Sequence, residues 1–205
     1  MPAHGAALAE SEARRLLAVD RLTLLLQLAY SGELAATRAY LGHRHSVRRA
    51  AERREIGTIV RDEIEHRHCI LGMLEALGSG PNPARERKMA RVGRSISTFC
   101  QVGGWFFPMY GAARLEAQNI REYALAARLA VVARRHPFVD PLLQMAEVEW
   151  DHELYFREKA ASHWLWTVMP KWPLPPPRED IRASFKVFDA VTWVVPVVQV
   201  PWLVR

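Results

Sequence analysis

Two copies of the pattern Glu-x-x-His lie on apolar helical faces of this sequence. Glu63 and His66 form the first copy, and Glu149 and His152 form the second. This spacing places both side chains of a copy on one face of a helix, one turn apart. The residues that share each face are apolar, which places both pairs in the core. They are Ile56, Ile59, Ile70, Met73 and Leu77 for the first copy, and Phe138, Leu142, Met145 and Phe156 for the second.

A single glutamate on a similar apolar face precedes each copy. Glu33 shares its face with Leu26 and Ala36, and Glu116 shares its face with Met109 and Ala112. Thirty residues separate Glu33 from the next motif glutamate, and thirty-three separate Glu116 from the one that follows it, so the order Glu, Glu-x-x-His is repeated. A buried carboxylate is costly unless a partner or a metal compensates its charge.

A third copy of the motif shows how specific this signal is. Glu65 and His68 have the same spacing, but they share a helical face with Arg61 and Glu75, which is typical of a solvated surface. The motif alone therefore carries little information. The coincidence of motif, apolar face and duplication distinguishes the other two copies.

Four carboxylates and two imidazoles form the ligand set of helical proteins that bind two iron or two manganese ions. Bridging glutamates can hold two such ions a few Å apart. Cys69 and Cys100 are the two cysteines of the chain, too few for a thiolate metal cage. We therefore expect a centre with two Fe ions, with manganese as the alternative metal. The expected metal ligands and catalytic residues are Glu33, Glu63, His66, Glu116, Glu149 and His152.

Less specific interpretations exist for the same residues and their neighbours. The buried carboxylates could pair with arginines. Glu122 is an alternative to Glu116, although its spacing from the apolar face fits less well. Asp62 and Asp151 are either partners of the ligand histidines or surface acids, and Tyr123 is either a core aromatic or a redox residue. We expect loop or surface positions for His43, His45, His136 and His163.

Helices must position these residues, and helical periodicity dominates the chain, which predicts an all-α protein. Gly42 is a stop signal, residues 78–83 form a cluster of helix breakers, and further breaks follow at 103–104 and 135–137. We expect helices over residues 20–41, with an amphipathic lead-in over 6–19, and over 46–77, 84–101, 105–130 and 138–166.

The positions of the turns test whether the ligands of paired helices lie at the same height along the bundle axis. In an antiparallel helix pair, each turn must lie near the midpoint of the two glutamates. The midpoint of the second pair lies near Ala133, next to the break at 135–137, whereas that of the first lies at Arg48, several residues after Gly42. A turn through residues 43–45 would therefore offset Glu33 from Glu63.

The composition limits the class of protein and its partners. The chain has 205 residues, is 50% hydrophobic and carries a formal charge of +6, which excludes a disordered or collagen-like chain. The positive charge favours an anionic partner. We do not expect nucleic acid, because the arginine pairs at 14–15, 48–49 and 53–54 lie on helices without an aromatic platform. Few cysteines and no recognisable leader favour a cytoplasmic location.

The C-terminal segment differs from the rest of the chain. We expect a helical domain over residues 1–169 and a proline-rich linker with an apolar tail over 170–205. The apolar run is broken by Pro196 and Pro201 and is shorter than the ~20 residues of a spanning helix. It either packs on the helices or on a second subunit of a homo-oligomer, or docks peripherally at the inner face of a membrane. Its apolar residues include Trp193, Val195, Val198, Trp202 and Leu203.

Two segments carry a resemblance to a known family. Residues 29–42 (AYSGELAATRAYLG) resemble the first ligand segment of demethoxyubiquinone hydroxylases, and residues 61–68 (RDEIEHRH) are similar to that family and to ferritin-like proteins generally. The resemblance covers residues 22–159. It implies a ferritin-like four-helix bundle with accessory helices, the six residues above as iron ligands, and hydroxylation of a membrane-borne quinone in ubiquinone biosynthesis. The family carries a His-Tyr pair where this chain has Glu122 and Tyr123, and its pattern does not include the tail.

The expected function is that of a di-iron monooxygenase that uses dioxygen to hydroxylate an apolar small molecule or lipid, quinone-like in its ring. The sequence contains no flavin or reductase motif, so a separate electron donor is expected. One alternative is a ferroxidase or iron-handling protein with the same ligands and no apolar pocket leading to the metals. Another is a non-enzymatic helical interaction protein with a vestigial site, which would bind no metal.

Overall fold

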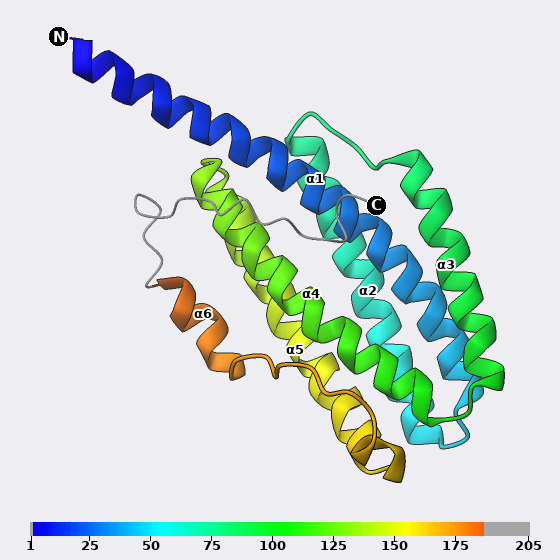
Figure 1. The fold of residues 1–205 in the computed structure, drawn as a ribbon. Coiled ribbons are helices and arrows are strands. Elements are labelled where there is room, and N and C mark those ends of the chain that lie inside the picture. The colour runs from blue at the N-terminus through cyan, green and yellow to red at the C-terminus, as the bar shows by residue number, and fades with distance from the viewer. Residues whose placement is uncertain (1, 187–205) are drawn as a thin grey trace.

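The computed structural model describes residues 2–186, and the chain is all-helical over that range (Figure 1). Within these residues there is no strand, so the all-α prediction is confirmed. The α-helices are α1 (Pro2–Ser46), α2 (Ala50–Ala76), α3 (Pro83–Val102), α4 (Phe106–Val132), α5 (Val139–Ala161) and α6 (Arg178–Lys186). Short 3-10 helices occupy His136–Phe138 and Trp164–Thr167.

Helices α1, α2, α4 and α5 run side by side, and α3 lies along the outer side of α1 (Figure 1). Their apolar faces form two separate buried clusters. One contains Leu22, Leu74 and Leu142, and the other contains Ile56 and Phe156. Burying a large apolar side chain contributes roughly 1.5–3 kcal/mol, so these clusters hold the four helices together on both sides of the level at which Glu33 and Glu63 lie.

The prediction that Gly42 ends the first helix is wrong. The lead-in and the first helix form one continuous helix, α1, which runs on to Ser46. Gly42 instead permits close packing, because a Cβ atom there would lie 2.2 Å from Ser97 Oγ and 2.5 Å from Ser97 Cα. Gly93 on α3 faces α1 in the same way, with a Cβ atom 2.7 Å from the carbonyl oxygen of Ala35. Two glycines therefore let α3 lie against α1.

The longer α1 also removes the expected offset between the ligand levels. The turn between α1 and α2 occupies residues 47–49 and is thus centred on Arg48, the midpoint of Glu33 and Glu63. Helix α2 consequently begins at Ala50 and not at Ser46. In the second pair α4 ends at Val132, and Arg134 adopts a left-handed conformation with φ 57° in the break that follows.

The chain after α5 packs back onto the helices. Helix α5 ends at Ala161, earlier than expected, and the proline-rich residues 170–177 form no helix but remain against the helices. Tyr110 Oη donates to the carbonyl oxygen of Pro170 at 2.6 Å, and Trp150 Nε1 donates to that of Pro176 at 2.8 Å. In α6, Ile181 is buried. The apolar residues predicted to pack or to dock at a membrane, from Trp193 onward, lie outside the described residues.

None of the helices described in residues 2–186 is long and apolar enough to cross a membrane.

Candidate metal centre

The six predicted ligands come together in one layer between the two apolar clusters. Helix α1 contributes Glu33, α2 contributes Glu63 and His66, α4 contributes Glu116, and α5 contributes Glu149 and His152. None of the six residues is more than 6% exposed. Their convergence follows from the faces predicted by the 3.6-residue period and from turns that lie midway between paired glutamates.

The ligand atoms fall into two overlapping groups of four. Glu33, Glu63, His66 and Glu149 form one group, and Glu63, Glu116, Glu149 and His152 form the other. Within each group the ligand atoms lie within 4.8 Å of one another. Glu63 and Glu149 belong to both groups. This arrangement suits two metal positions that share two bridging carboxylates.

Both histidines direct Nδ1 toward the shared glutamates. His66 Nδ1 lies 3.1 Å from Glu149 Oε1, and His152 Nδ1 lies 3.3 Å from Glu149 Oε2. The other ring nitrogen of His152, Nε2, lies 3.1 Å from Asp62 Oδ2. A proton held between Nε2 and Asp62 leaves the Nδ1 lone pair for a metal. Of the two aspartates considered as histidine partners, Asp62 therefore takes this position.

Asp151 has a different partner. Its carboxylate accepts from Arg178 Nε at 3.0 Å, and both side chains are well exposed. The interaction attaches the start of α6 to α5. Asp151 is thus a surface acid, as the less specific interpretation had it.

Two buried tyrosines connect the duplicated halves. Tyr40 on α1 donates from Oη to Glu116 on α4, and Tyr123 on α4 donates from Oη to Glu33 on α1. Each tyrosine stands seven residues after the glutamate of its own helix, which is two turns along the same face. Each half therefore supplies the hydrogen bond that orients a carboxylate of the other half. Asn119 Nδ2 also donates to Glu116, at 2.8 Å.

Burial dominates the proton equilibria of these carboxyls. It raises the pKa of Glu33 and of Glu116 well above the ordinary value, and adjacent carboxylates raise both further. It also raises the pKa of Glu63 to about 8. For Glu149, hydrogen bonds from His152 and His66 outweigh burial and lower the pKa. Without a cation, three of the four carboxyls thus favour the protonated form.

Contacts with carboxylates raise the pKa values of both imidazoles, whereas burial lowers them. Burial favours the neutral ring, but the contacts with Glu149 raise the pKa of His66, and those with Asp62, Glu149 and Glu63 raise the pKa of His152. A metal ion would displace protons from both rings and from the carboxyls, because ligands bind in their deprotonated forms.

The donor set fits a pair of divalent cations. Glu33 Oε2 and both carboxylate oxygens of Glu63 are buried and have no hydrogen-bond partner among the described residues. Within that part of the chain no lysine or arginine lies within 4.0 Å of any of the four carboxylates, so the ion-pair interpretation fails for them. Glu153 shows the contrast, since Arg157 pairs with this buried glutamate at 3.0 Å.

The remaining candidates lie outside this layer. Glu122, the alternative to Glu116, accepts a hydrogen bond from Gln118 at 2.7 Å and lines a cavity. The glutamate that α4 contributes to the centre is therefore Glu116. Glu65 and His68 are exposed, in agreement with their polar helical face. His45 and His136 are exposed as predicted, and His163 is half-buried against the Phe106 ring at 5.0 Å between centroids.

The prediction of a loop or surface position is wrong for His43. Its side chain is 1% exposed within α1 and stacks on Phe156 with ring centroids 5.8 Å apart. Burial lowers its pKa to about 4. The extension of α1 beyond Gly42 is the reason, because it carries His43 into the apolar cluster.

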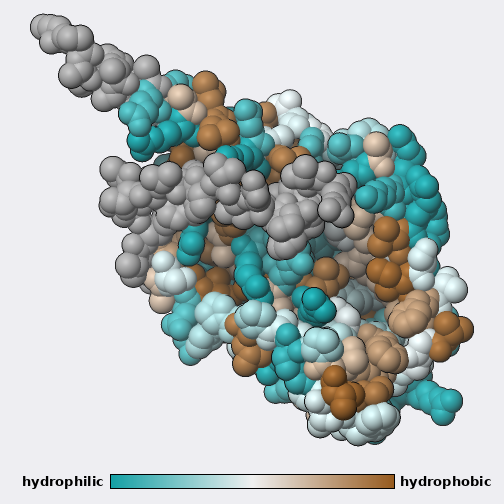
Figure 2. Space-filling model, viewed as in Figure 1, coloured by the Kyte–Doolittle hydropathy of each residue, from teal (hydrophilic) through white to brown (hydrophobic). Residues whose placement is uncertain are grey.

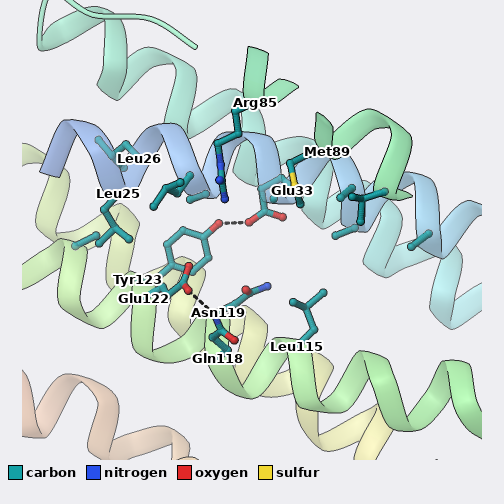
Figure 3. A pocket seen from close by; sticks show the side chains of 18 of the residues that line it. Leu25, Leu26, Glu33, Arg85, Met89, Leu115, Gln118, Asn119, Glu122 and Tyr123 are labelled. Carbon is teal, nitrogen blue, oxygen red and sulfur yellow. Dashed lines mark hydrogen bonds between the residues drawn. The ribbon is translucent and has the colours of Figure 1, made fainter. Parts of the chain in front are cut away.

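A cavity of about 270 Å³ between α1, α3 and α4 reaches the centre at Glu33 and Tyr123 (Figure 3). Most of its wall is apolar, and Arg85, Gln118, Asn119 and Glu122 are its other polar residues. The apolar lining includes Leu25, Leu26, Ala36, Met89, Ile96 and Leu115. Small molecules are commonly bound in mostly apolar pockets with a few polar groups at fixed positions.

Exposed apolar side chains surround this cavity. Val92 and Ile96 on α3 and Leu115 on α4 line the cavity and are 36%, 43% and 42% exposed. Phe99 and Phe107 add exposed rings nearby in the chain. Figure 2 shows apolar side chains, in brown, at the surface where α3 and the start of α4 lie. The entrance therefore favours an apolar molecule.

Sequence reasoning missed the roles of Tyr40, Asn119 and Arg85. Tyr40 was recognisable, because it and Tyr123 stand at the same distance after Glu33 and Glu116. No pattern in the sequence indicates that Arg85 enters a cavity, since that depends on how α3 packs.

Comparison with known proteins finds no matching family model, no similar curated protein and no similar solved structure.

Proposed function

We propose that this chain is a di-iron carboxylate oxidoreductase with the ferritin-like four-helix-bundle fold. It uses dioxygen and electrons from a separate donor to hydroxylate an apolar molecule. The observation that carries the proposal is the joint presence of two overlapping ligand groups and an apolar cavity that ends at one of them. The sequence resemblance implies a quinone-type ring as one substrate within this class.

Each ligand has a role that follows from its place. Glu63 and Glu149 would bridge the two ions, while His66 and Glu33 would complete one position and His152 and Glu116 the other. A pair of ferrous ions held by these residues would supply the dioxygen chemistry. In the overall reaction a C–H bond, dioxygen, two electrons from the separate donor and two protons would give a hydroxyl group and one water. Manganese is the alternative metal for the same oxygen-rich donor set.

The surrounding residues prepare the site for this reaction. Tyr40 and Tyr123 hold the carboxylates of Glu116 and Glu33 by hydrogen bonds, and Asp62 holds the ring of His152. The apolar cavity wall excludes water from the approach to Glu33. Peripheral contact with a membrane would present an apolar substrate directly, and we include it in the proposal as the route of delivery.

The cavity favours a hydroxylase over a ferroxidase. A protein that only oxidises ferrous iron needs no apolar chamber next to its ligands, whereas an organic substrate does. The vestigial-site alternative is disfavoured by the buried oxygens of Glu33 and Glu63 that find no hydrogen-bond partner among the described residues, a costly arrangement that a bound cation relieves.

Elemental analysis of the purified protein, loaded anaerobically with ferrous iron, tests the metal site. We expect about two irons per chain, as in di-iron carboxylate bundles, and their loss in a Glu63→Ala, His152→Ala double variant. The matched control is a Glu65→Ala, His68→Ala double variant, which removes the exposed copy of the motif from the same part of α2 and should keep both irons. No bound metal in the unaltered protein would overturn the proposal.

A single-turnover reaction of the loaded protein with dioxygen and apolar ring compounds then separates the alternatives. Incorporation of labelled oxygen into the organic product supports the hydroxylase. Consumption of ferrous iron with no organic product would identify a ferroxidase. A Leu115→Trp variant narrows the cavity at its entrance and should lose the product while it keeps its metal content.

A further inference from the structure

Arg85 brings a positive charge into the wall of the apolar cavity. Its side chain enters from α3 and points toward the hydrogen bond between Tyr123 and Glu33 (Figure 3). A guanidinium stays protonated at neutral pH. Burial lowers the pKa of Arg85 from its ordinary value, against the effect of the Glu122 charge. A charge in an apolar wall has a cost, which a bound counter-charge would offset.

One edge of this guanidinium is fixed, and the other edge is available. Arg85 Nε donates to Ser31 Oγ at 2.8 Å, and Ser31 is itself held by the carbonyl oxygens of Gln27 and Leu28 at 3.1 Å and 2.9 Å. The two terminal nitrogens, Nη1 and Nη2, make no hydrogen bond and no ion pair within 4.0 Å with any residue that the structure describes. The neighbouring Arg67, by comparison, donates from both of its terminal nitrogens to Glu86.

Two carboxyl groups of the protein face the same cavity, and neither forms an ion pair with Arg85. Glu122 accepts from Gln118 at 2.7 Å, and Glu33 accepts from Tyr123. Asn119 uses its Nδ2 for Glu116. The cavity therefore presents two guanidinium donors that the surrounding residues leave unused.

We propose that the molecule bound in this cavity consists of an apolar body and a carboxylate, and that Arg85 binds the carboxylate through Nη1 and Nη2. The proposal names the substrate class of the proposed oxidoreductase. It rests on that function only in calling the molecule a substrate, and the binding itself does not depend on it. A carboxylate has two oxygens that match the planar fork of a guanidinium. With its carboxylate at Arg85, beside the Tyr123–Glu33 hydrogen bond, the apolar body of the ligand extends from there along the apolar lining of the chamber.

Neutral ligands meet a penalty at the same place. An apolar molecule without an anionic group displaces water from Arg85 and leaves the charge unpaired. A quinone carbonyl accepts hydrogen bonds but carries no charge, so it compensates the guanidinium less well than a carboxylate does. Selectivity thus comes from the attraction of the anion and from the cost of leaving Arg85 without one.

The test is calorimetric binding of matched probes to the full chain, both metal-free and iron-loaded. The probes are octanoate, octan-1-ol, octylamine and a neutral alkylated benzoquinone. We expect octanoate to bind at least about tenfold more tightly than octan-1-ol in the unaltered protein, as expected for a hydrogen bond to a charged group. Arg85→Gln should remove this preference. Glu122→Gln should strengthen octanoate binding, because it removes a negative charge from the same cavity.

Arg91→Gln is the matched control. Arg91 lies on the same helix, is exposed and does not line the cavity, so the preference for octanoate should persist. Circular dichroism establishes that each variant folds. If Arg85→Gln does not fold, the direction of the Glu122→Gln effect still decides the matter.

Several results would overturn the inference. They are equal or tighter binding of the alcohol, the amine or the quinone, an Arg85→Gln variant that keeps the preference, a Glu122→Gln variant that binds octanoate more weakly, and a chain that binds none of the probes. Octanoate binding without metal uptake would overturn the proposed function and leave this inference standing. Metal uptake with hydroxylation of neutral probes, and no preference for carboxylates, would overturn this inference and leave the proposed function standing.

Discussion

In the metal-free protein, the free energy of unfolding should fall as the pH rises. The reason is the pKa of Glu63, which burial raises from 4.5 to about 8. Between these values the folded chain keeps a proton that the unfolded chain releases, so the free energy of unfolding falls with increasing pH. The raised pKa values of Glu33, Glu116 and His66 act in the same direction. The lowered pKa of Glu149 acts below pH 4.5 and so outside this window.

The magnitude follows from the linkage relation. One proton retained on folding changes the free energy of unfolding by about 1.4 kcal/mol per pH unit. For a pKa of 4.5 in the unfolded chain and about 8 in the folded one, Glu63 alone contributes a loss of roughly 3 to 4 kcal/mol between about pH 5 and about pH 8. This is a large part of the 5–15 kcal/mol by which a domain is ordinarily stable, as an order of magnitude.

Urea unfolding of the chelator-treated protein across this pH range measures the effect. The Glu63→Gln variant should lose most of the dependence contributed by that residue, because glutamine does not titrate. Glu65→Gln, an exposed position on the same helix, is the control and should keep it. With iron bound the trend should reverse, since the ions displace protons and bind more tightly as the pH rises. A metal-free stability that is constant or increases between about pH 5 and about pH 8 would refute the reasoning.

Three further tests address separate parts of the structure. Asp62→Asn should weaken metal binding roughly 10- to 100-fold in a competition titration, because it loosens the ring of His152. Asp151→Asn is the control and should leave metal binding unchanged. Equal effects of the two substitutions would contradict the assignment of Asp62 as the partner of His152. Gly42→Ala should destabilise the fold by about 1–3 kcal/mol, because its Cβ atom would meet Ser97, whereas Gly72→Ala in the open part of α2 should stabilise it by up to about 1 kcal/mol. Urea midpoints that fail to separate these two glycines would show that α3 is not held closely against α1. Tyr123→Phe should cost about 1–3 kcal/mol in the metal-free protein by removing the donor to a buried oxygen of Glu33, and an unchanged unfolding free energy would show that this hydrogen bond contributes little.

The sequence predicts the all-α fold and the composition of the buried layer. A ligand such as Glu63 lies on a face defined by its own helix, so the apolar residues around it are sufficient to assign it to the interior. The duplication adds a second independent instance, with Glu149 in the corresponding place. The residues of both instances meet in one layer. The sequence predicts this for the second pair, whose midpoint lies next to the break at 135–137, but not for the first pair, because Gly42 indicates a helix end before the midpoint at Arg48.

Features that depend on contacts between distant helices could not be predicted. Gly42 looks like a helix stop in the local sequence, and its use as a close contact depends on where α3 packs. For the same reason the sequence does not distinguish Asp62 from Asp151 as the partner of a ligand histidine. The distinction depends on the packing of α6, which brings Arg178 to Asp151. The position of Arg85 in the cavity wall likewise has no local signal.

Helix α3 has a consequence that extends beyond this one chain. It contributes Arg85, Met89, Val92 and Ile96 to the cavity wall, while all six predicted metal ligands lie on other helices. Substitutions on α3 can therefore alter which molecule fits the cavity and leave the layer of candidate metal ligands unchanged. Variation within this one twenty-residue segment is enough to change part of the cavity wall, so that selection can act on ligand recognition and on the candidate metal ligands independently.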